Sequence, residues 1–339
     1  TSIGYTNEQG YIIGSQFKRY TARANVNSQI TKWLKVGSNL SANLSYSDGN
    51  QNESQGNNIN PFRFVRYVGP IYPIHVHNPE TGEYLRDANG DLIYDFGTGY
   101  SVNGIEVPAR DYISGNNPAL ELQKNYDSNK RNTINAKAYA EVSFLNDFKF
   151  TFNGGVGANS YLSSSAAIVY PEKGNTGSAT KSNSFTTTWT FNELLTYSKV
   201  IDKHHFDILL GHESYDYEYN YLTASMKEQK FDNNYELGNY SNLNTTPNSY
   251  THKYATEGYL SRFNYDYDSK YFASGSFRRD GSSRFYKDSR WGNFWSIGGG
   301  WRIDKEKFMS KFKFIDLLKL RGSYGEVGND DIGGYYPWR

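Results

Sequence analysis

The sequence predicts an all-β chain that forms part of a large antiparallel up-and-down transmembrane β-barrel. Three observations point to this fold. Apolar and polar residues alternate over long segments, short and long connections alternate along the chain, and aromatic residues gather where the segments end. An alternation with a period of two is typical of strands, because successive side chains point to opposite faces of a sheet. We count about ten or eleven such strands.

The alternation is clearest in residues 33–46, 132–144 and 148–160. Weaker versions lie in residues 20–30, 185–197, 205–213, 255–267, 270–278, 293–303 and 318–327. A strand of about 13 residues is roughly 43 Å long, and at a tilt of about 45° it rises roughly 30 Å, the thickness of a bilayer's hydrocarbon core. Strands of globular proteins usually have about 5–6 residues. The length of the segments therefore favours strands that cross a membrane.

The odd-numbered and the even-numbered residues of each segment are expected to lie on opposite faces, and we call these two sets the parities of the segment. The apolar parity is expected to face lipid, and it includes Leu40, Leu44, Ala138, Val142, Phe150, Val156 and Trp295. The polar parity is expected to face a watery lumen, and it includes Asn39, Asn43, Lys137, Glu141, Asn153 and Arg302. Polar side chains can stay on such a face without protein partners, because the lumen hydrates them.

The connections sort into two kinds. Short ones are predicted at residues 30–33, 144–148, 197–205 and 267–270, and long ones at residues 47–130, 161–184, 215–254 and 279–292. Outer-membrane barrels have short periplasmic turns and long extracellular loops in the same alternation. Residues 304–314 are an exception of medium length at a short-turn end. We expect a short helical turn there, capped by Asp304.

Aromatic residues are expected to form a band near each end of the strands, where amphipathic rings prefer the headgroup level. At the short-turn ends these are Trp33, Phe144, Phe148, Phe206, Tyr265, Tyr267, Tyr271 and Trp301. At the loop ends they are Tyr20, Tyr46, Tyr161 and Phe277. The alternative interpretation is ordinary strand propensity, with the rings packed in a soluble core.

Composition excludes several classes of protein. The 339 residues include 36 basic and 35 acidic ones, so net charge indicates no nucleic-acid partner. Aromatic residues make up 17%, which argues against disorder although the mean hydropathy is -0.76. The absence of Cys excludes disulfides and thiolate chemistry. The sequence contains no apolar run long enough for a transmembrane helix. Neither terminus resembles a natural one, so we expect a piece of a longer chain.

The long loop at residues 47–130 is the main candidate for ligand contact, because loops of this length are usually functional or disordered. Its prolines and aromatic rings indicate a structured loop. The candidate contact residues are Tyr67, Tyr72, Tyr84, Tyr94, Tyr100 and Tyr112. The competing interpretation, which we favour for any single ring, is that it packs the loop onto itself.

Residues 87–95, DANGDLIYD, offer several oxygen ligands for calcium but lack the EF-hand spacing, and Asn89-Gly90 equally predicts a hairpin turn. His75 and His77 share a strand parity, with no third metal ligand evident nearby. The sequence has no nucleophile elbow, Walker loop, zincin helix or dinucleotide fingerprint. We therefore expect neither an enzyme nor a cofactor.

Several motifs resemble the barrel of SusC/RagA-type TonB-dependent transporters. They are GYTNEQGYIIGSQFKRYTARANVNSQITKWLKVGSNLS near the start, FNYDYDSKYFASGSFRRDG, RRDGSSRF, WGNFWSIGGGWRIDKEKFM and LKLRGSYGEVGNDDIG. The similarity extends along the whole chain in order and spacing. The long loop fits it least specifically.

This resemblance implies a barrel of about 22 strands, of which residues 1–339 would be a middle portion without the plug domain and the C-terminal strands. It implies a place in the bacterial outer membrane, in contact with lipid, and a SusD-like surface lipoprotein as partner. Energy would come from the TonB complex through the absent N-terminal region. The cargo would be a large nutrient, an oligosaccharide first and a peptide second.

Two alternatives stay open at this point. A soluble glycan-binding β-sandwich also alternates, but it would pack the Leu40, Val142 and Phe150 side against a second sheet. A passive porin-like channel would lack a plug and a TonB-box upstream. Neither the identity of the cargo nor the oligomeric state follows from the sequence.

Overall fold

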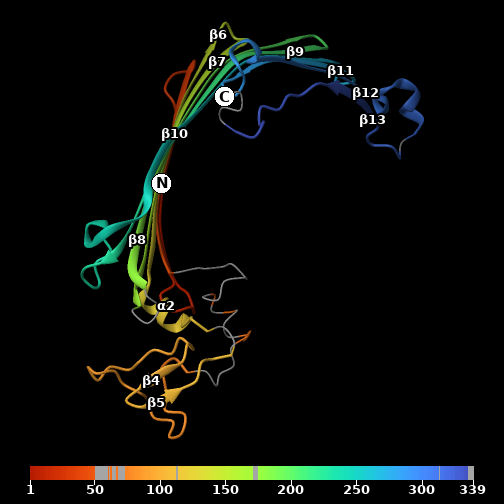
Figure 1. Cartoon of the computed structure of the whole chain (residues 1–339). Helices are drawn as coiled ribbons and strands as arrows, with labels where there is room; N and C mark the ends of the chain where they lie inside the picture. The colour runs from red at the N-terminus through yellow and green to blue at the C-terminus, as the bar shows by residue number, and fades with distance from the viewer. Residues whose placement is uncertain are drawn as a thin grey trace.

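The chain folds into one curved antiparallel sheet in which each strand pairs with its neighbours in the sequence (Figure 1). The computed structural model describes residues 1–49, 60, 62, 66–67, 73–111, 114–170, 175–312 and 314–334. The eleven strands, in chain order and in sheet order, are β1 (Ser2–Gln9), β2 (Gln16–Gln29), β3 (Leu34–Asp48), β6 (Tyr126–Phe144), β7 (Phe148–Tyr170), β8 (Asn175–Ile201), β9 (His204–Gln229), β10 (Tyr240–Tyr267), β11 (Tyr271–Ser282), β12 (Trp291–Arg302) and β13 (Lys319–Gly325). The predicted all-β up-and-down fold is confirmed.

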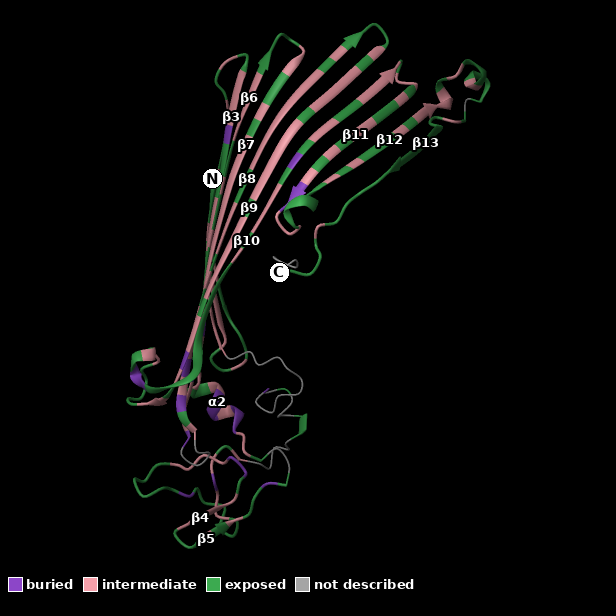
Figure 2. Ribbon diagram, turned by 45° about the horizontal axis from the view of Figure 1, so that its top comes forward, coloured by how far each residue is buried: buried purple, intermediate pink, exposed green. Residues whose placement is uncertain are grey.

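The sheet has no second layer among the described residues. The only other sheet there is the two-stranded pair of β4 (Tyr100–Val102) and β5 (Ile105–Val107). Most strand residues are exposed or half-buried, as Figure 2 shows. Leu40 is 49% exposed, Phe150 38% and Trp295 41%, so the apolar side does not pack against another sheet. The sandwich alternative, which required such packing, is therefore wrong for the described part of the chain.

The short connections agree with the sequence prediction. β6 and β7 form a tight hairpin whose last pair is Phe144 and Phe148. The β8–β9 hairpin closes after Ile201 and the β10–β11 hairpin after Tyr267. Non-glycine residues with positive φ make these turns, among them Asn146 at 61° and Asp202 at 50°. Asn and Asp tolerate this left-handed region better than most residues.

Two long connections predicted from the sequence are wrong, because the strands continue through them. β7 and β8 pair up to Tyr170 and Asn175, and β9 and β10 pair up to Gln229 and Tyr240. A ladder needs only backbone hydrogen bonds, so it continues where apolar alternation ends. Hydroxyl pairs add cross-strand contacts in this polar part. Thr180 lies 2.8 Å from Ser225, and Ser182 lies 2.7 Å from Thr223, between hydroxyl oxygens.

The connection between β3 and β6 forms a small structured unit at the end of the sheet opposite the tight hairpins (Figure 1). It contains β4, β5, three isolated bridges and α2 (Pro118–Lys124). Asn117 caps α2 by accepting a hydrogen bond from the Leu120 backbone N–H, at 3.1 Å. Its amide nitrogen donates to the carbonyls of Ile74 and Asp95 and so ties α2 to the loop. Figure 2 shows the buried residues gathered at this end.

The exceptional connection between β12 and β13 contains two short 3₁₀ helices, η4 (Ile303–Lys305) and η5 (Lys307–Lys311). The expected cap by Asp304 is wrong, because neither helix has a side-chain cap. Asp304 instead accepts hydrogen bonds from Arg302, at 2.8 and 2.6 Å, and from the Leu318 backbone N–H at 3.1 Å. It therefore fastens the start of the connection to its end. In the part of the chain that the structure describes, no helix has the length and apolar character needed to cross a membrane.

The extended ladders can be tested by amide hydrogen exchange in the intact protein. We expect the amides of residues 178–186 in β8 to exchange about tenfold or more slowly than those of residues 86–91, because two neighbouring strands hold them. Mass spectrometry of peptic peptides gives both rates in one experiment. Equal rates would contradict the extension of the strands.

Candidate functional site

The pairing register gives the sheet two chemically distinct faces. Directly paired residues of antiparallel strands point to the same side. One row of such pairs runs across eight strands, from Leu34 through Val142, Phe150, Leu195, Leu210, Ser261 and Phe277 to Trp295. We call this side the outward face and the opposite side the inward face.

The structure places all seven residues predicted to face lipid on the outward face. Leu40 pairs with Ala136, which pairs with Val156, and Leu44 and Ala138 have the same parity on their strands. Aromatic rings also lie on this face near the tight hairpins, with centroids 5.5 Å apart for Phe144 and Phe148 and 5.2 Å apart for Phe206 and Tyr265. That lipid covers this face stays a prediction.

The six residues predicted to face the lumen all lie on the inward face, and the structure brings three of them together. Asn39, Lys137 and Asn153 line a groove of about 700 Å³. The other members of its lining are mainly amides, hydroxyls and glycines: Asn25, Asn27, Asn135, Gly155, Gly157, Thr188, Thr190 and Asn192. Asn153 donates a hydrogen bond to the Asn192 side-chain oxygen at 2.6 Å. We call this the amide groove.

The other three lie apart from the amide groove. Glu141 is 3.7 Å from both the Lys35 and the Lys149 ammonium groups. Arg302 pairs with Asp304 at the short-turn end. Asn43 lies on β3 towards the loop end. The charged groups of Glu141 and Arg302 are thus both in ion pairs.

A charged pocket of about 640 Å³ adjoins the amide groove and shares Thr190 and Asn192 with it. Arg278 is its central residue and donates hydrogen bonds to Glu213 at 2.9 Å and to Asp280 at 3.2 and 3.1 Å. Two carboxylates therefore hold one guanidinium in a fixed position. The groove and the pocket together form a continuous polar surface across β2–β12.

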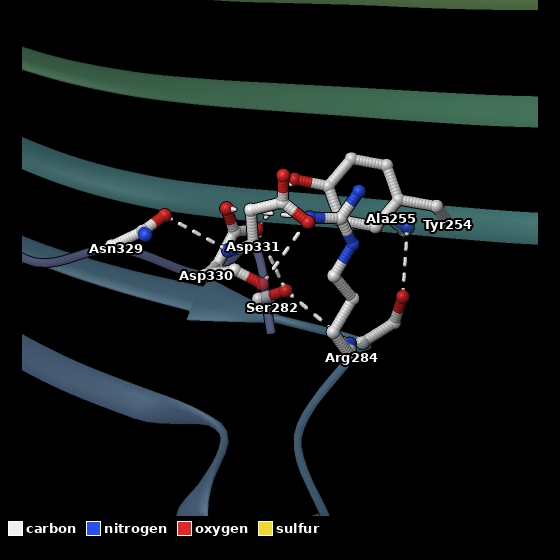
Figure 3. A network of polar contacts seen from close by, with 8 residues as sticks. Tyr254, Ala255, Ser282, Arg284, Asn329, Asp330 and Asp331 are labelled. Carbon is white, nitrogen blue, oxygen red and sulfur yellow. Dashed lines mark hydrogen bonds and ion pairs between the residues drawn. The ribbon is translucent and has the colours of Figure 1, made fainter. Parts of the chain in front are cut away.

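The segment after β13 closes one side of this pocket (Figure 3). Asp330 accepts hydrogen bonds from the Tyr254 hydroxyl at 2.5 Å and from Ser282 at 3.0 Å, and Arg284 donates to its backbone carbonyl at 3.2 Å. Burial raises the pKa of Asp330, but the hydrogen bonds from Tyr254 and Ser282 outweigh it and leave the pKa below its ordinary value of 3.8. The Asp330 carboxylate is therefore ionised at neutral pH. Its hydrogen bonds from Tyr254 and Ser282 are lost only when the pH falls through its pKa, which lies below 3.8.

Gly328 allows this segment to approach the sheet. A Cβ atom at Gly328 would lie 2.2 Å from the ring of Phe294 on the inward face, which is closer than real contacts permit. The segment thus lies directly on the inward face, within the curve of the sheet, as Figures 1 and 2 also show.

The loop tyrosines do not converge on one site among the described residues. Tyr100 supports the loop backbone, since its hydroxyl donates to the Tyr94 carbonyl and accepts from the Phe96 N–H. Tyr94 packs against the cluster of Phe96, Leu120 and Tyr170. Tyr84 and Tyr67 are 55% and 50% exposed, so their rings are accessible. Tyr72 and Tyr112 lie outside the described residues.

Residues 87–95 form a hairpin turn. Asp87 accepts hydrogen bonds from the backbone N–H groups of Asn89 and Asp91, both at 2.9 Å, and Gly90 has a φ of 88°. His75 and His77 stack on Tyr94 and Tyr84, with centroids 4.7 and 4.4 Å apart. In the described ranges, no three His, Asp or Glu side chains gather closely enough to hold a metal ion.

The sequence analysis did not predict that Glu213, Arg278 and Asp280 form one cluster. The sequence alone indicates no partner for Arg278 on another strand. The alternation in RRDG does place Arg278 and Asp280 on one face, two residues apart. Glu213 comes from β9 and meets them only through the pairing of β9, β10 and β11, which depends on register.

Asp330 gives a test of the closed pocket. Asp330→Asn should speed amide exchange of residues 326–334 by about tenfold, because a neutral amide loses the charge-assisted hydrogen bonds from Tyr254 and Ser282. Asp331→Asn is the matched control, since its side chain is 74% exposed and, among the described residues, its carboxylate pairs with Arg284. An equal change in both variants would contradict the role given to Asp330.

Comparison with protein-family profiles finds no match. The TonB-dependent receptor P39 of Formosa agariphila is 28% identical over 345 residues, which covers 98% of this chain and 29% of the relative. The TonB-dependent receptor SusC of Bacteroides thetaiotaomicron is 26% identical and covers 99% of this chain and 33% of the relative. The chain thus spans about a third of the length of these relatives.

A solved structure of the RagAB peptide transporter has the same fold. It superposes with a TM-score of 0.73 at 26% identity, covering 98% of this chain and 35% of that one. In sequence and in fold, the chain is similar to part of the barrel of SusC/RagA-like TonB-dependent receptors.

Proposed function

We propose that this chain forms part of the barrel wall and one extracellular loop of an active outer-membrane importer of large nutrients. Residues 1–339 would be a middle portion of the barrel domain, with residues 47–130 as an extracellular loop. The observation that carries the proposal is the pair of faces set by one register. The outward face offers an apolar wall, and the inward face offers the amide groove and the charged pocket as a continuous polar surface.

The chemistry of the inward face favours a neutral, hydroxyl-rich cargo. Asparagine amides both donate and accept hydrogen bonds, so they can exchange partners with sugar hydroxyls at little cost. In the charged pocket, Glu213 and Asp280 already compensate Arg278. An oligosaccharide is therefore our first candidate. A peptide is the second, since its backbone makes the same hydrogen bonds and a relative of this fold is a peptide transporter.

Active import requires more than a barrel wall. We propose that a plug domain fills the lumen and that TonB supplies energy through it. A SusD-like surface lipoprotein would cover the barrel on the side of the β3–β6 loop. No bond is made or broken in this process. The wall binds the cargo weakly and lets it pass once the plug rearranges.

Uptake measurements test the proposal. Cells that express the intact protein should accumulate a labelled oligosaccharide from a panel of glycans and peptides, and a protonophore should abolish this uptake. A passive channel would continue to admit the cargo after the proton gradient collapses. Uptake of peptides alone would show that the cargo is a peptide and not an oligosaccharide. Unchanged uptake in a strain that lacks the protein would overturn the import proposal.

The face assignment is tested by two arginine substitutions at similar distances from the β6–β7 hairpin. Val156 faces outward and pairs with Ala136, whereas Asn135 faces inward in the amide groove. Val156→Arg should destabilise the folded barrel by about 2–4 kcal/mol, because a charge would face hydrocarbon. Asn135→Arg should change stability by less than about 0.5 kcal/mol.

Heat-modifiable migration and urea unfolding of the refolded, intact protein measure both effects. Val142 would be a weaker site, since it lies two residues before the end of β6, where lipid gives way to headgroups. Equal stability of the Val156 and Asn135 variants would contradict the assignment of the outward face to lipid.

A further inference from the structure

The connection at residues 303–318 is longer than its hairpin requires. Arg302 and Lys319 are directly paired at the ends of β12 and β13, so a turn of two to four residues would join them. The other hairpins at this end of the sheet use such turns, for example between Ile201 and His204. The extra residues must therefore serve something other than closing the hairpin.

The connection is fastened to the outward face. Glu306 accepts hydrogen bonds from the Tyr271 hydroxyl at 2.6 Å and from the Trp301 indole N–H at 3.0 Å, and its other oxygen lies 2.6 Å from the Lys270 ammonium. Tyr271 and Trp301 are paired across β11 and β12, and both have the outward parity. The hydrogen bond from Lys270 is the main reason that the pKa of Glu306 is lowered to about 2, so the carboxylate stays charged.

Large apolar side chains project from this connection into open space. Phe308 is 57% exposed, Phe314 82% and Leu317 64%, and Phe312 and Leu318 are also exposed. Phe312 and Phe314 touch only edge to face, with centroids 6.2 Å apart. Such a group of apolar side chains is unfavourable in water and marks an interaction surface.

Positive charge accompanies the apolar side chains. Lys305, Lys307 and Lys311 are exposed. Two of the three acidic residues of the connection are already paired, Asp304 with Arg302 and Glu306 with Lys270, which leaves Asp316 as the remaining one. Lysines interleaved with phenylalanines are typical of segments that lie in the headgroup region of an anionic membrane.

We propose that the described residues of this connection, 303–312 and 314–318, are an interfacial anchor that binds the periplasmic leaflet of the outer membrane through anionic phospholipid. Phe308, Phe314 and Leu317 enter the boundary between headgroups and acyl chains, and the lysines contact lipid phosphates. The outward position of Glu306 places the anchor beside the aromatic residues of the hairpin ends. The inference rests on the proposed membrane location, and the experiment separates the two.

Depth-dependent quenching tests the anchor in the intact protein reconstituted in nanodiscs. The chain has no Cys, so single cysteines introduced by Phe308→Cys, Trp295→Cys and Phe231→Cys can each carry an environment-sensitive dye, provided that the rest of the protein has no accessible thiol. Phe231 is the matched control, an exposed phenylalanine at the far end of β9. Spin-labelled lipids with the label near the headgroup should quench the dye at position 308 at least twofold and leave position 231 unchanged.

The dye at position 295, on the outward face, distinguishes failure of the anchor proposal from failure of the proposed membrane location. Quenching at 295 by deeply labelled lipid without any quenching at 308 would overturn the anchor and leave the membrane location standing. Water-like emission at both positions would overturn the membrane location as well. Quenching at 308 equal to that at 231 would also reject the anchor.

Lipid charge is tested in the same system. Raising phosphatidylglycerol from zero to about a third of the lipid should increase shallow quenching at position 308. The double variant Lys307→Glu and Lys311→Glu should remove this increase. Lys32→Glu, at another short turn of the same end, should retain it. An increase that survives the double variant would contradict headgroup binding by these lysines.

Discussion

The whole structure depends on an unbroken antiparallel ladder. A strand that crosses hydrocarbon has no water for its backbone N–H and C=O groups, so each must find a partner on a neighbouring strand. Here β2, β3 and each strand from β6 to β12 are paired on both sides within the large sheet. The same ladder fixes the register, and a shift by one residue would exchange the two faces. The apolar wall and the polar groove are therefore two consequences of one set of hydrogen bonds.

The inward face carries polar groups that pair with one another. Glu141 lies between two lysines, and Arg278 lies between Glu213 of β9 and Asp280 of its own strand. The amide groove carries few charges, so it can hydrogen-bond a cargo without holding it strongly. A weak, extended surface of this kind suits passage better than tight capture, since a deep charged site would retain what it binds.

Local periodicity predicted the fold class, the tight hairpins and the parity of each face, because these depend only on neighbouring residues. Periodicity failed to predict the parts of strands that only backbone hydrogen bonds hold together. The Ser- and Thr-rich ends of β7–β10 lack apolar alternation and still pair, as Thr180 and Ser225 show. It also failed for contacts between distant segments. Asp304 binds Leu318 rather than a helix end, and Asp330 meets Tyr254 across 76 residues of chain.

The outward face includes a polar cluster on β8–β10, and its geometry explains how an apolar wall can contain it. The imidazole of His212 lies 2.9 Å from a Glu193 oxygen and 3.2 Å from a Glu257 oxygen, with the ring of Tyr259 packed on it at 4.9 Å. The polar groups therefore satisfy one another, and the Tyr259 hydroxyl donates to Glu257 at 2.8 Å. Glu193 pairs with Phe152, so the cluster lies within the apolar wall, between the row of Phe150 and the row of Val156. Polar groups that hydrogen-bond one another cost less to remove from water than unpaired ones, which is how an apolar wall can contain this cluster.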